Sequence, residues 1–314
     1  MSRAFIFPGQ GSQQVGMGRA LAEAFPAARE VFEEVNDTLG QKLSRLMWEG
    51  PESDLTLTEN AQPAIMAASL AVIRVLEQEG GLDLAQHARL LAGHSLGEYS
   101  ALAAAGALTL PDAARLLRLR GRAMQDAVPP GEGAMSALLG IEVADAEAAC
   151  IEAAAQGGVC VVANDNAPGQ VVVSGTRATV ERTGNTAKDH GAKRAMMLAV
   201  SAPFHSPLMG PAAERMREAL GQVTIKAPAA PIVANVTAAE IGEPETIRRL
   251  LVEQVTSRVR WRESVLSFRH LGVGMTVECG GNKVLTAMVK RIDRELEAVS
   301  LDSPADIEIF AKTL

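Results

Sequence analysis

A serine in the segment Gly93-His94-Ser95-Leu96-Gly97 is the clearest candidate for covalent chemistry in this sequence. The segment has the pattern G-x-S-x-G and lies between a short apolar strand, expected at 88–92, and an expected helix. In that context the small residues permit a sharp turn that exposes the serine oxygen. The backbone N–H of Leu96, at the helix start, can then face an oxyanion. The pattern predicts a nucleophilic serine; an ordinary glycine-flanked turn is the alternative.

A serine nucleophile needs a base, and His205 is the best placed of the five histidines. It lies in an irregular loop, 201–207, between an expected strand and an expected helix, where catalytic groups are common. His94 should point away from the serine across the turn. The remaining three fit surface or helix-end positions: His87, His190 and His270. A purely structural role for His205 is the alternative.

The acidic residues between Ser95 and His205 show no pattern beyond helix caps and turns. An α/β-hydrolase triad would place its Asp or Glu in that interval. The sequence therefore predicts a Ser–His dyad in which a neutral acceptor orients the imidazole.

The glycine-rich segment at 7–13 follows the first expected strand, but it fits neither phosphate-binding pattern. Met17 stands where a Walker loop needs lysine, and Gln14 stands where the dinucleotide motif needs its last glycine. What remains is a tight loop able to aim the Gln10 N–H at a neighbouring strand end.

Arg120 is one of four arginines on the expected helix after Pro111. If it were buried beside the nucleophile, its guanidinium could bind a substrate carboxylate with two hydrogen bonds. A solvated basic helix is the alternative from the residues alone.

The composition excludes several classes of function. Aromatic residues make up 3% of the 314 residues, too few for the stacking platforms that bind single-stranded nucleic acid. The formal charge of −7 has the wrong sign for a general polyanion binder. Three cysteines without a zinc-binding spacing indicate buried thiols in a reducing compartment and no metal. With neither a signal peptide nor a membrane-length apolar run, we expect a cytoplasmic protein.

Strands alternate with helices along the chain, which predicts an α/β fold with a largely parallel sheet. The order strand, helix, strand, strand, helix, strand over 134–200 predicts an inserted ferredoxin-like unit. We therefore expect a large domain at 1–128 and 201–314, and a small domain at 129–200 after a Pro-Gly linker. The expected strands are 4–7, 88–92, 134–139, 159–163, 170–174 and 193–200. The main expected helices are 27–39, 59–79, 144–155 and 178–191.

Five motifs, in this order, resemble the malonyl-CoA:acyl carrier protein transacylase family of bacterial fatty acid synthesis. They are FPGQGSQ at 7–13, GHSLGEYSAL at 93–102, LRLRGRAMQ at 117–125, NDNAPGQ at 164–170 and FHSPLM at 204–209. The similarity extends from residue 4 to about residue 292. It implies an α/β-hydrolase-like large domain with the inserted ferredoxin-like unit.

The resemblance also implies a role for each matching residue. Ser95 would carry the acyl group and His205 would act as base and acid. The amides of Gln10 and Leu96 would form the oxyanion hole. Arg120 would bind the carboxylate of the acyl group, and Asn164 and Phe204 would lie beside that group. Phe204 would favour malonyl over branched acyl groups.

A backbone carbonyl in the stretch 257–261 would orient the histidine, and we assign this role to Arg260. Relatives often read Asn-Pro-Val-Gln-Trp in that stretch, so this sequence departs at Arg258 and Arg260.

The implied reaction is ping-pong transfer of malonyl from malonyl-CoA to the phosphopantetheine thiol of acyl carrier protein. The resemblance implies a monomer with no permanently bound cofactor. Because carrier proteins are acidic, docking needs a local basic patch. Its candidates are Lys193, Arg194, Lys283, Lys290 and Arg291. The alternatives are an acyltransferase of polyketide synthesis or malonate decarboxylation, a serine thioesterase or hydrolase, and a non-catalytic acyl-CoA-binding protein.

Overall fold

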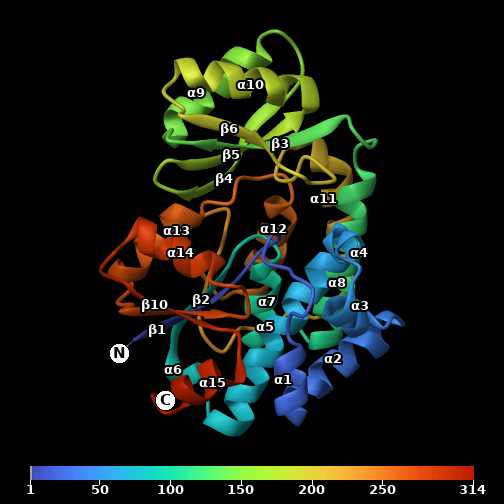
Figure 1. Ribbon diagram of the computed structural model, residues 1–314, viewed down its shortest axis with the longest axis vertical. Helices are drawn as coiled ribbons and strands as arrows, with labels where there is room; N and C mark the ends of the chain where they lie inside the picture. The colour runs from blue at the N-terminus through green and yellow to red at the C-terminus, as the bar shows by residue number, and fades with distance from the viewer. Residues whose placement is uncertain (1) are drawn as a thin grey trace.

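The computed structural model describes residues 2–314 and contains two separate β-sheets (Figure 1). The strands of the larger sheet are β1 (Arg3–Phe7), β2 (Ala88–Gly93), β7 (Ile232–Val233), β8 (Glu240–Ile241), β9 (Met275–Cys279) and β10 (Glu297–Leu301). Their order is β10-β9-β1-β2-β7-β8, and only the pair β7–β8 is antiparallel. This largely parallel sheet confirms the predicted fold class.

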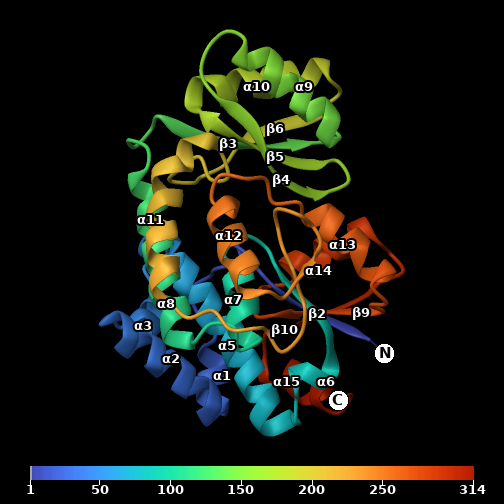
Figure 2. The same ribbon diagram turned by 180° about the vertical axis from the view of Figure 1, so that it is seen from behind.

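Helices cover both faces of the larger sheet (Figures 1 and 2). Those before the small sheet are α1 (Arg19–Ala24), α2 (Pro26–Leu39), α3 (Leu43–Glu49), α4 (Glu52–Thr56), α5 (Thr58–Gly80), α6 (Leu84–His87), α7 (Gly97–Ala104) and α8 (Leu110–Asp126). Those after it are a 3-10 turn (Pro207–Met209), α11 (Gly210–Gln222), α12 (Pro244–Gln254), α13 (Trp261–His270), α14 (Val284–Ile292) and α15 (Pro304–Ala311).

Strand β1 shows why the larger sheet must be covered on both faces. Its residues alternate between two cores, because successive side chains of a strand point to opposite faces. Phe5 and Phe7 pack into a core that includes residues of α2, α5 and α8. Ala4 and Ile6 pack into a second core with residues of α13 and α14. The site therefore stands on strands that are fixed from both sides.

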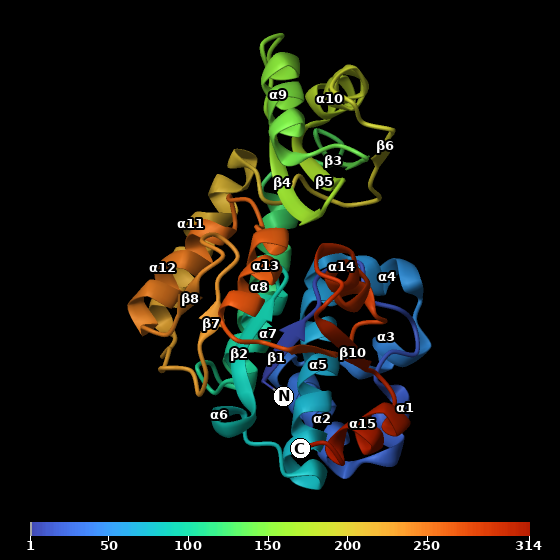
Figure 3. The same ribbon diagram turned by 90° about the vertical axis from the view of Figure 1, so that its left-hand side faces the viewer.

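The smaller sheet comprises β3 (Gly133–Leu139), β4 (Cys160–Ala167), β5 (Gln170–Thr176) and β6 (Arg194–Met197). Its order is β4-β5-β3-β6 with every pair antiparallel, and the helices α9 (Val143–Ala154) and α10 (Arg177–Asp189) belong to the same unit. This is the predicted ferredoxin-like arrangement, and Figure 3 shows it at one end of the molecule. These elements fall within 129–200; the division of the chain into two domains remains a prediction.

Strand β4 is longer than expected, since the prediction ended at 163. The polar residues 164–166 fall between the expected strands 159–163 and 170–174, yet Asn164 and Asp165 pair with β5. Asn164 also forms a bridge to Val259 of the larger part of the chain. The polar run is therefore part of a strand that also contacts the segment between α12 and α13.

Strand β6 is shorter than the predicted 193–200. The residues after Met197 leave the sheet and lead to His205, and Leu198 to Val200 line the same cavity as Ser95. Within residues 2–314, none of the helices is both long and apolar enough to span a bilayer.

Candidate active site

Ser95 occupies a strained turn between β2 and α7. Its φ of 53° lies in the left-handed region, which is costly for a residue with a side chain. The two flanking positions, Gly93 and Gly97, have no space for a side chain. A Cβ on Gly93 would lie 1.9 Å from the backbone of Gly97, and one on Gly97 would lie 2.2 Å from the carbonyl oxygen of Phe7. The pattern G-x-S-x-G is thus a packing requirement here, and it projects the serine oxygen from the strand end.

The side chain of His205 meets that oxygen. Its Nε2 lies 2.8 Å from Ser95 Oγ, and its Nδ1 lies 2.9 Å from the carbonyl oxygen of Gln254. His205 is 4% exposed and also has a left-handed φ, of 57°. Because a carbonyl only accepts, Nδ1 must donate to it, which leaves the lone pair on Nε2 free to accept the serine proton.

The predicted role of Arg260 as the orienting carbonyl is wrong. The carbonyl oxygen of Arg260 accepts hydrogen bonds from Ser264, from the backbone N–H and from Oγ, because it caps the first turn of α13. The acceptor for His205 is instead Gln254, the last residue of α12, whose carbonyl lacks an i+4 helical donor and accepts only a long bond of 3.4 Å from the Ser257 amide.

The environment keeps His205 neutral. Burial lowers the pKa of its imidazole to about 3, with a further lowering from the positive charge of Arg120. The acceptor at Gln254 opposes this shift without cancelling it. A neutral imidazole is the form that can act as a base.

Gln10, Ser95 and Leu96 line one cavity of about 340 Å³. Within residues 2–314 neither backbone N–H donates a hydrogen bond to the protein. The Gln10 loop follows β1 and is fixed beside the turn, where the His94 amide donates to the Phe7 carbonyl at 2.9 Å. Two free amides next to a nucleophile have the composition of an oxyanion hole; that role remains a prediction.

Arg120 is buried at the base of the same cavity, 1% exposed. Its Nη1 donates to Gln62 Oε1 at 2.9 Å, and its Nη2 donates to Gln254 Oε1 at 2.8 Å and to Ser95 Oγ at 3.2 Å. Its Nε has no partner within residues 2–314. Its hydrogen-bond partners are all neutral, and the buried carboxyl group of Glu98 acts on it only through space, across the Gln254 side chain that both residues contact. The structure therefore contains a buried cation beside the nucleophile that no carboxylate contacts directly.

Asn164 and Phe204 also line the cavity, as do Met124, Met135 and Met288. The structure therefore brings together every predicted site residue except Arg260. His94 turns away from the serine as expected: its Nε2 lies 2.8 Å from Asn166 Oδ1, and its ring packs against Trp261. The structure shows no group of three His, Cys, Asp or Glu suited to a metal ion within residues 2–314.

The family model for the acyl transferase domain matches residues 4–303 of this sequence. The chain belongs to the acyl transferase domain family. A strained serine, a neutral histidine and two free amides are the groups that acyl transfer requires.

Individual relatives of this acyl transferase are similar over nearly their whole length. The malonyl CoA-acyl carrier protein transacylase of Bacillus subtilis (strain 168) is 45% identical over 311 residues, which covers 99% of this chain and 96% of the relative. The crystal structure of the acyl-carrier-protein-S-malonyltransferase from Bartonella henselae is 52% identical, with a TM-score of 0.97, and the match covers 100% of this chain and 99% of that one. A malonyl-transacylase solved in complex with a type II PKS acyl-carrier protein is 43% identical, with a TM-score of 0.96 and full coverage of both chains.

Two residues that support the turn in this acyl transferase were missed by the sequence reasoning. Asn235 accepts from the Ser95 amide at 2.7 Å through Oδ1 and donates to the Gly93 carbonyl at 2.6 Å. The side-chain amide of Gln254 donates to the Ser95 carbonyl at 3.0 Å and to Glu98 at 2.8 Å. Burial raises the pKa of Glu98 to about 7, although the hydrogen bonds from the Gln254 side chain and the Asn235 backbone amide lower it. The only signal in the sequence was that Asn235 follows an apolar strand.

Proposed function

We propose that this acyl transferase moves a malonyl group from malonyl-CoA to the phosphopantetheine thiol of acyl carrier protein, through a malonyl ester on Ser95. The observation that carries the proposal is Arg120, a buried guanidinium 3.2 Å from Ser95 Oγ with only neutral partners. A carboxylated acyl group would supply an anion in direct contact with the arginine and accept two hydrogen bonds from it. The printed names of the relatives, which include malonyl CoA-acyl carrier protein transacylase, support the same substrate and acceptor.

In the first half-reaction, His205 Nε2 takes the Ser95 proton as Oγ attacks the thioester carbonyl of malonyl-CoA. The charge that develops on the carbonyl oxygen is stabilised by the amides of Gln10 and Leu96. The C–S bond then breaks, and the proton held by His205 passes to the sulfur of the departing CoA. The Gln254 carbonyl stabilises the imidazolium during the step, because it accepts from Nδ1.

The second half-reaction repeats these steps in reverse with a different thiol. His205 takes the proton of the pantetheine thiol, the sulfur attacks the malonyl ester, and Ser95 recovers its proton. Both thiols are carried by substrates, so we propose that the chain needs no resident cofactor. We also propose that it works as a monomer in the cytoplasm.

The molecule that accepts the acyl group distinguishes this function from that of a serine thioesterase. A thioesterase would use the same serine and histidine. The test mixes the enzyme with malonyl-CoA and pantetheinylated acyl carrier protein and quantifies malonyl-carrier protein and free malonate. We expect malonyl-carrier protein to be the main product. Malonate as the main product, formed at the same rate without carrier protein, would show that the chain is a hydrolase.

The five basic residues predicted for carrier docking are all exposed: Lys193, Arg194, Lys283, Lys290 and Arg291. Lys290 and Arg291 belong to α14, whose Met288 lines the cavity. The backbones of Gly140 and Gly169, which lie beside Lys193 and Arg291 respectively, are joined by a hydrogen bond of 2.8 Å. Lys193 and Arg291, which are distant in the sequence, thus lie close to each other, and such a local basic patch suits an acidic carrier protein.

Reversing two of these charges, with Lys290→Glu and Arg291→Glu together, is expected to raise KM for carrier protein by about tenfold, because complementary charge guides docking. KM for malonyl-CoA should change by less than about twofold. Steady-state kinetics with each substrate varied in turn measures both constants. Arg249→Glu, an exposed reversal on α12, is the matched control. An unchanged KM for carrier protein would place docking elsewhere.

A further inference from the structure

The polar run of β4 connects the small sheet to the segment that precedes α13. The Asp165 amide donates to the Val259 carbonyl at 3.0 Å, and the Val259 amide donates to the Ala163 carbonyl at 2.8 Å. One residue on, Asn166 Oδ1 lies 2.8 Å from Nε2 of His94, the neighbour of Ser95. We call β4 residues 163–166 with Val259 the inter-sheet bridge. Any shift of this bridge would move the wall of the acyl site.

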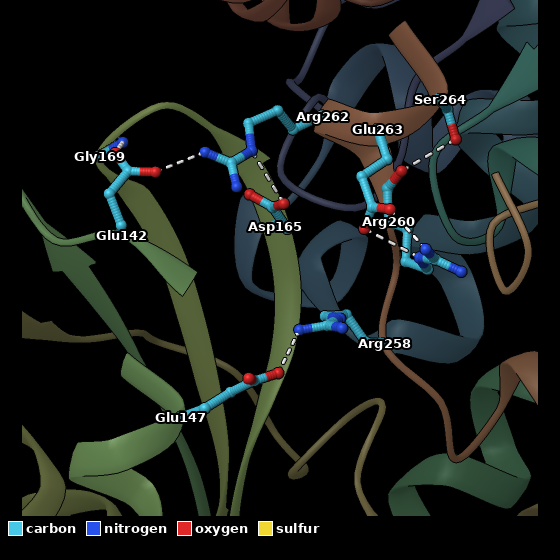
Figure 4. Close-up of polar contacts among 9 residues, drawn as sticks. All are labelled: Glu142, Glu147, Asp165, Gly169, Arg258, Arg260, Arg262, Glu263 and Ser264. Atoms are coloured by element: carbon cyan, nitrogen blue, oxygen red, sulfur yellow. Dashed lines mark hydrogen bonds and ion pairs between the residues drawn. The ribbon is translucent and has the colours of Figure 1, made fainter. Parts of the chain in front are cut away.

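Arg262, on α13, holds this bridge from one side. Its Nε lies 3.0 Å from Asp165 Oδ2, and its Nη1 lies 2.6 Å from Glu142 Oε2. The other oxygen of Glu142 accepts from the Gly169 amide at 3.1 Å, in the turn between β4 and β5. Figure 4 shows the guanidinium between the two carboxylates. One arginine therefore contacts both β4 itself and the residue that fixes the end of the β4–β5 hairpin.

The Asp165 carboxylate depends on this arginine. Its side chain is 2% exposed, and Oδ1 has no hydrogen-bond partner within residues 2–314. Burial raises the pKa of Asp165, and the charge of Arg262 opposes that rise. A buried carboxylate that loses its cation must either take up a proton or move toward water. Because Asp165 lies within the bridge, such a movement would carry Asn164 and Asn166 with it.

We propose that Arg262 is a positioning residue of the acyl-transfer site: by binding Asp165 and Glu142 together, it keeps the inter-sheet bridge closed against Ser95. The expected effect on malonylation rests on the proposed function, whereas the effect on the bridge does not. Arg262 touches neither the serine nor the cavity. It acts through β4, which places Asn164 in the cavity wall and Asn166 on His94.

The same boundary offers a matched control. Arg258 precedes Arg262 by four residues, and its Nη1 lies 2.6 Å from Glu147 of α9. This ion pair also joins the two parts of the chain, but its side chains are 28% and 48% exposed and neither belongs to β4. The charge of Arg258 also lowers the pKa of Asp165, but less than the charge and hydrogen bond of Arg262 do. Exposed pairs contribute little, so the loss of Arg258 should leave the bridge closed.

The test compares Arg262→Ala, Arg262→Gln, Arg262→Lys and Arg258→Ala with the wild type. Single-turnover malonylation of Ser95 gives the rate at saturating malonyl-CoA and the half-saturation concentration. Hydrogen–deuterium exchange of peptides that contain Asp165 and Val259 reports on the bridge without any substrate. Arg262→Gln keeps much of the side-chain volume and takes the place of the alanine variant if that one fails to fold.

We expect the saturated rate of the Arg262→Ala and Arg262→Gln variants to fall by about 10- to 100-fold, since a misplacement near 1 Å has an effect of this order. The half-saturation concentration should change by less than about threefold, and exchange at both amides should accelerate. Arg262→Lys should recover at least half of the loss on a logarithmic scale, because it keeps the charge beside Asp165. Arg258→Ala should match the wild type in rate and exchange.

Three results would overturn the proposal: unchanged exchange at Asp165 and Val259 in the Arg262→Ala or Arg262→Gln variant, wild-type malonylation by that variant, or an equal loss in Arg258→Ala. If the wild type itself were not malonylated, the proposed function would fail, and the exchange comparison would still decide whether Arg262 closes the bridge.

Discussion

Replacing Arg120 with alanine is expected to lower kcat/KM for malonyl transfer by about 10³-fold, whereas acetyl transfer should change by less than about tenfold. The factor of 10³ corresponds to about 4 kcal/mol. The physical reason is that the malonyl carboxylate enters a buried site, where losing its cation leaves a charge that is neither solvated nor paired. An acetyl group has no such charge, so it loses only packing and the smaller contribution of the Arg120 hydrogen bonds to Ser95 and Gln254. Initial rates with malonyl-CoA and acetyl-CoA, for wild type and variant, give both ratios.

Arg115→Ala is the matched control for this prediction. Arg115 lies on the same helix, α8, but its side chain is 61% exposed. We expect both transfer rates of this variant to stay within about twofold of the wild type. Equal losses of malonyl and acetyl transfer in the Arg120→Ala variant would mean that the arginine supports the fold of the site and does not bind a carboxylate.

Replacing His205 with alanine should slow malonylation of Ser95 by about 10³-fold at neutral pH, because a positioned base typically contributes 10²–10⁴-fold. The 2.8 Å contact between Nε2 and Ser95 Oγ is the geometry on which this expectation depends. Arg120 also contacts that oxygen and would remain, so the serine should stay in place while losing its proton acceptor. Rapid-quench measurement of the acylation rate tests the prediction. A loss of less than tenfold would show that another group accepts the proton.

The sequence was sufficient to predict the two central groups. Ser95 could be found because the requirement for Gly93 and Gly97 is local: their neighbours along the chain and the adjoining strand leave no room for a Cβ. His205 could be found because few histidines compete and it lies in a loop after a strand. The alternating order of strands and helices likewise predicted both sheets, because each element's pattern depends on its own residues.

What could not be predicted depends on packing between distant segments. The carbonyl that orients His205 belongs to Gln254 and not to Arg260, because the C-terminal end of α12 lies beside the histidine. Nothing in the local sequence records where a helix end will lie relative to a loop 49 residues away. The supporting role of Asn235 was missed for the same reason, since its partner Ser95 is 140 residues distant.

The extension of β4 shows a further limit of local patterns. Asn164, Asp165 and Asn166 are all polar and lie outside the expected strands, yet all three are buried in β4. The run is held by hydrogen bonds with Val259, Arg262 and His94, which lie on other elements. A polar strand of this kind can be recognised only when its partners are known.

Intact-mass spectrometry after brief mixing with malonyl-CoA tests the central claim most directly, with the Ser95→Ala variant as control. We predict a single malonyl adduct on the wild type, none on the variant, and loss of the adduct when pantetheinylated carrier protein is added. Absence of the adduct, or an adduct of equal size on the Ser95→Ala variant, would contradict transfer through a malonyl ester on Ser95.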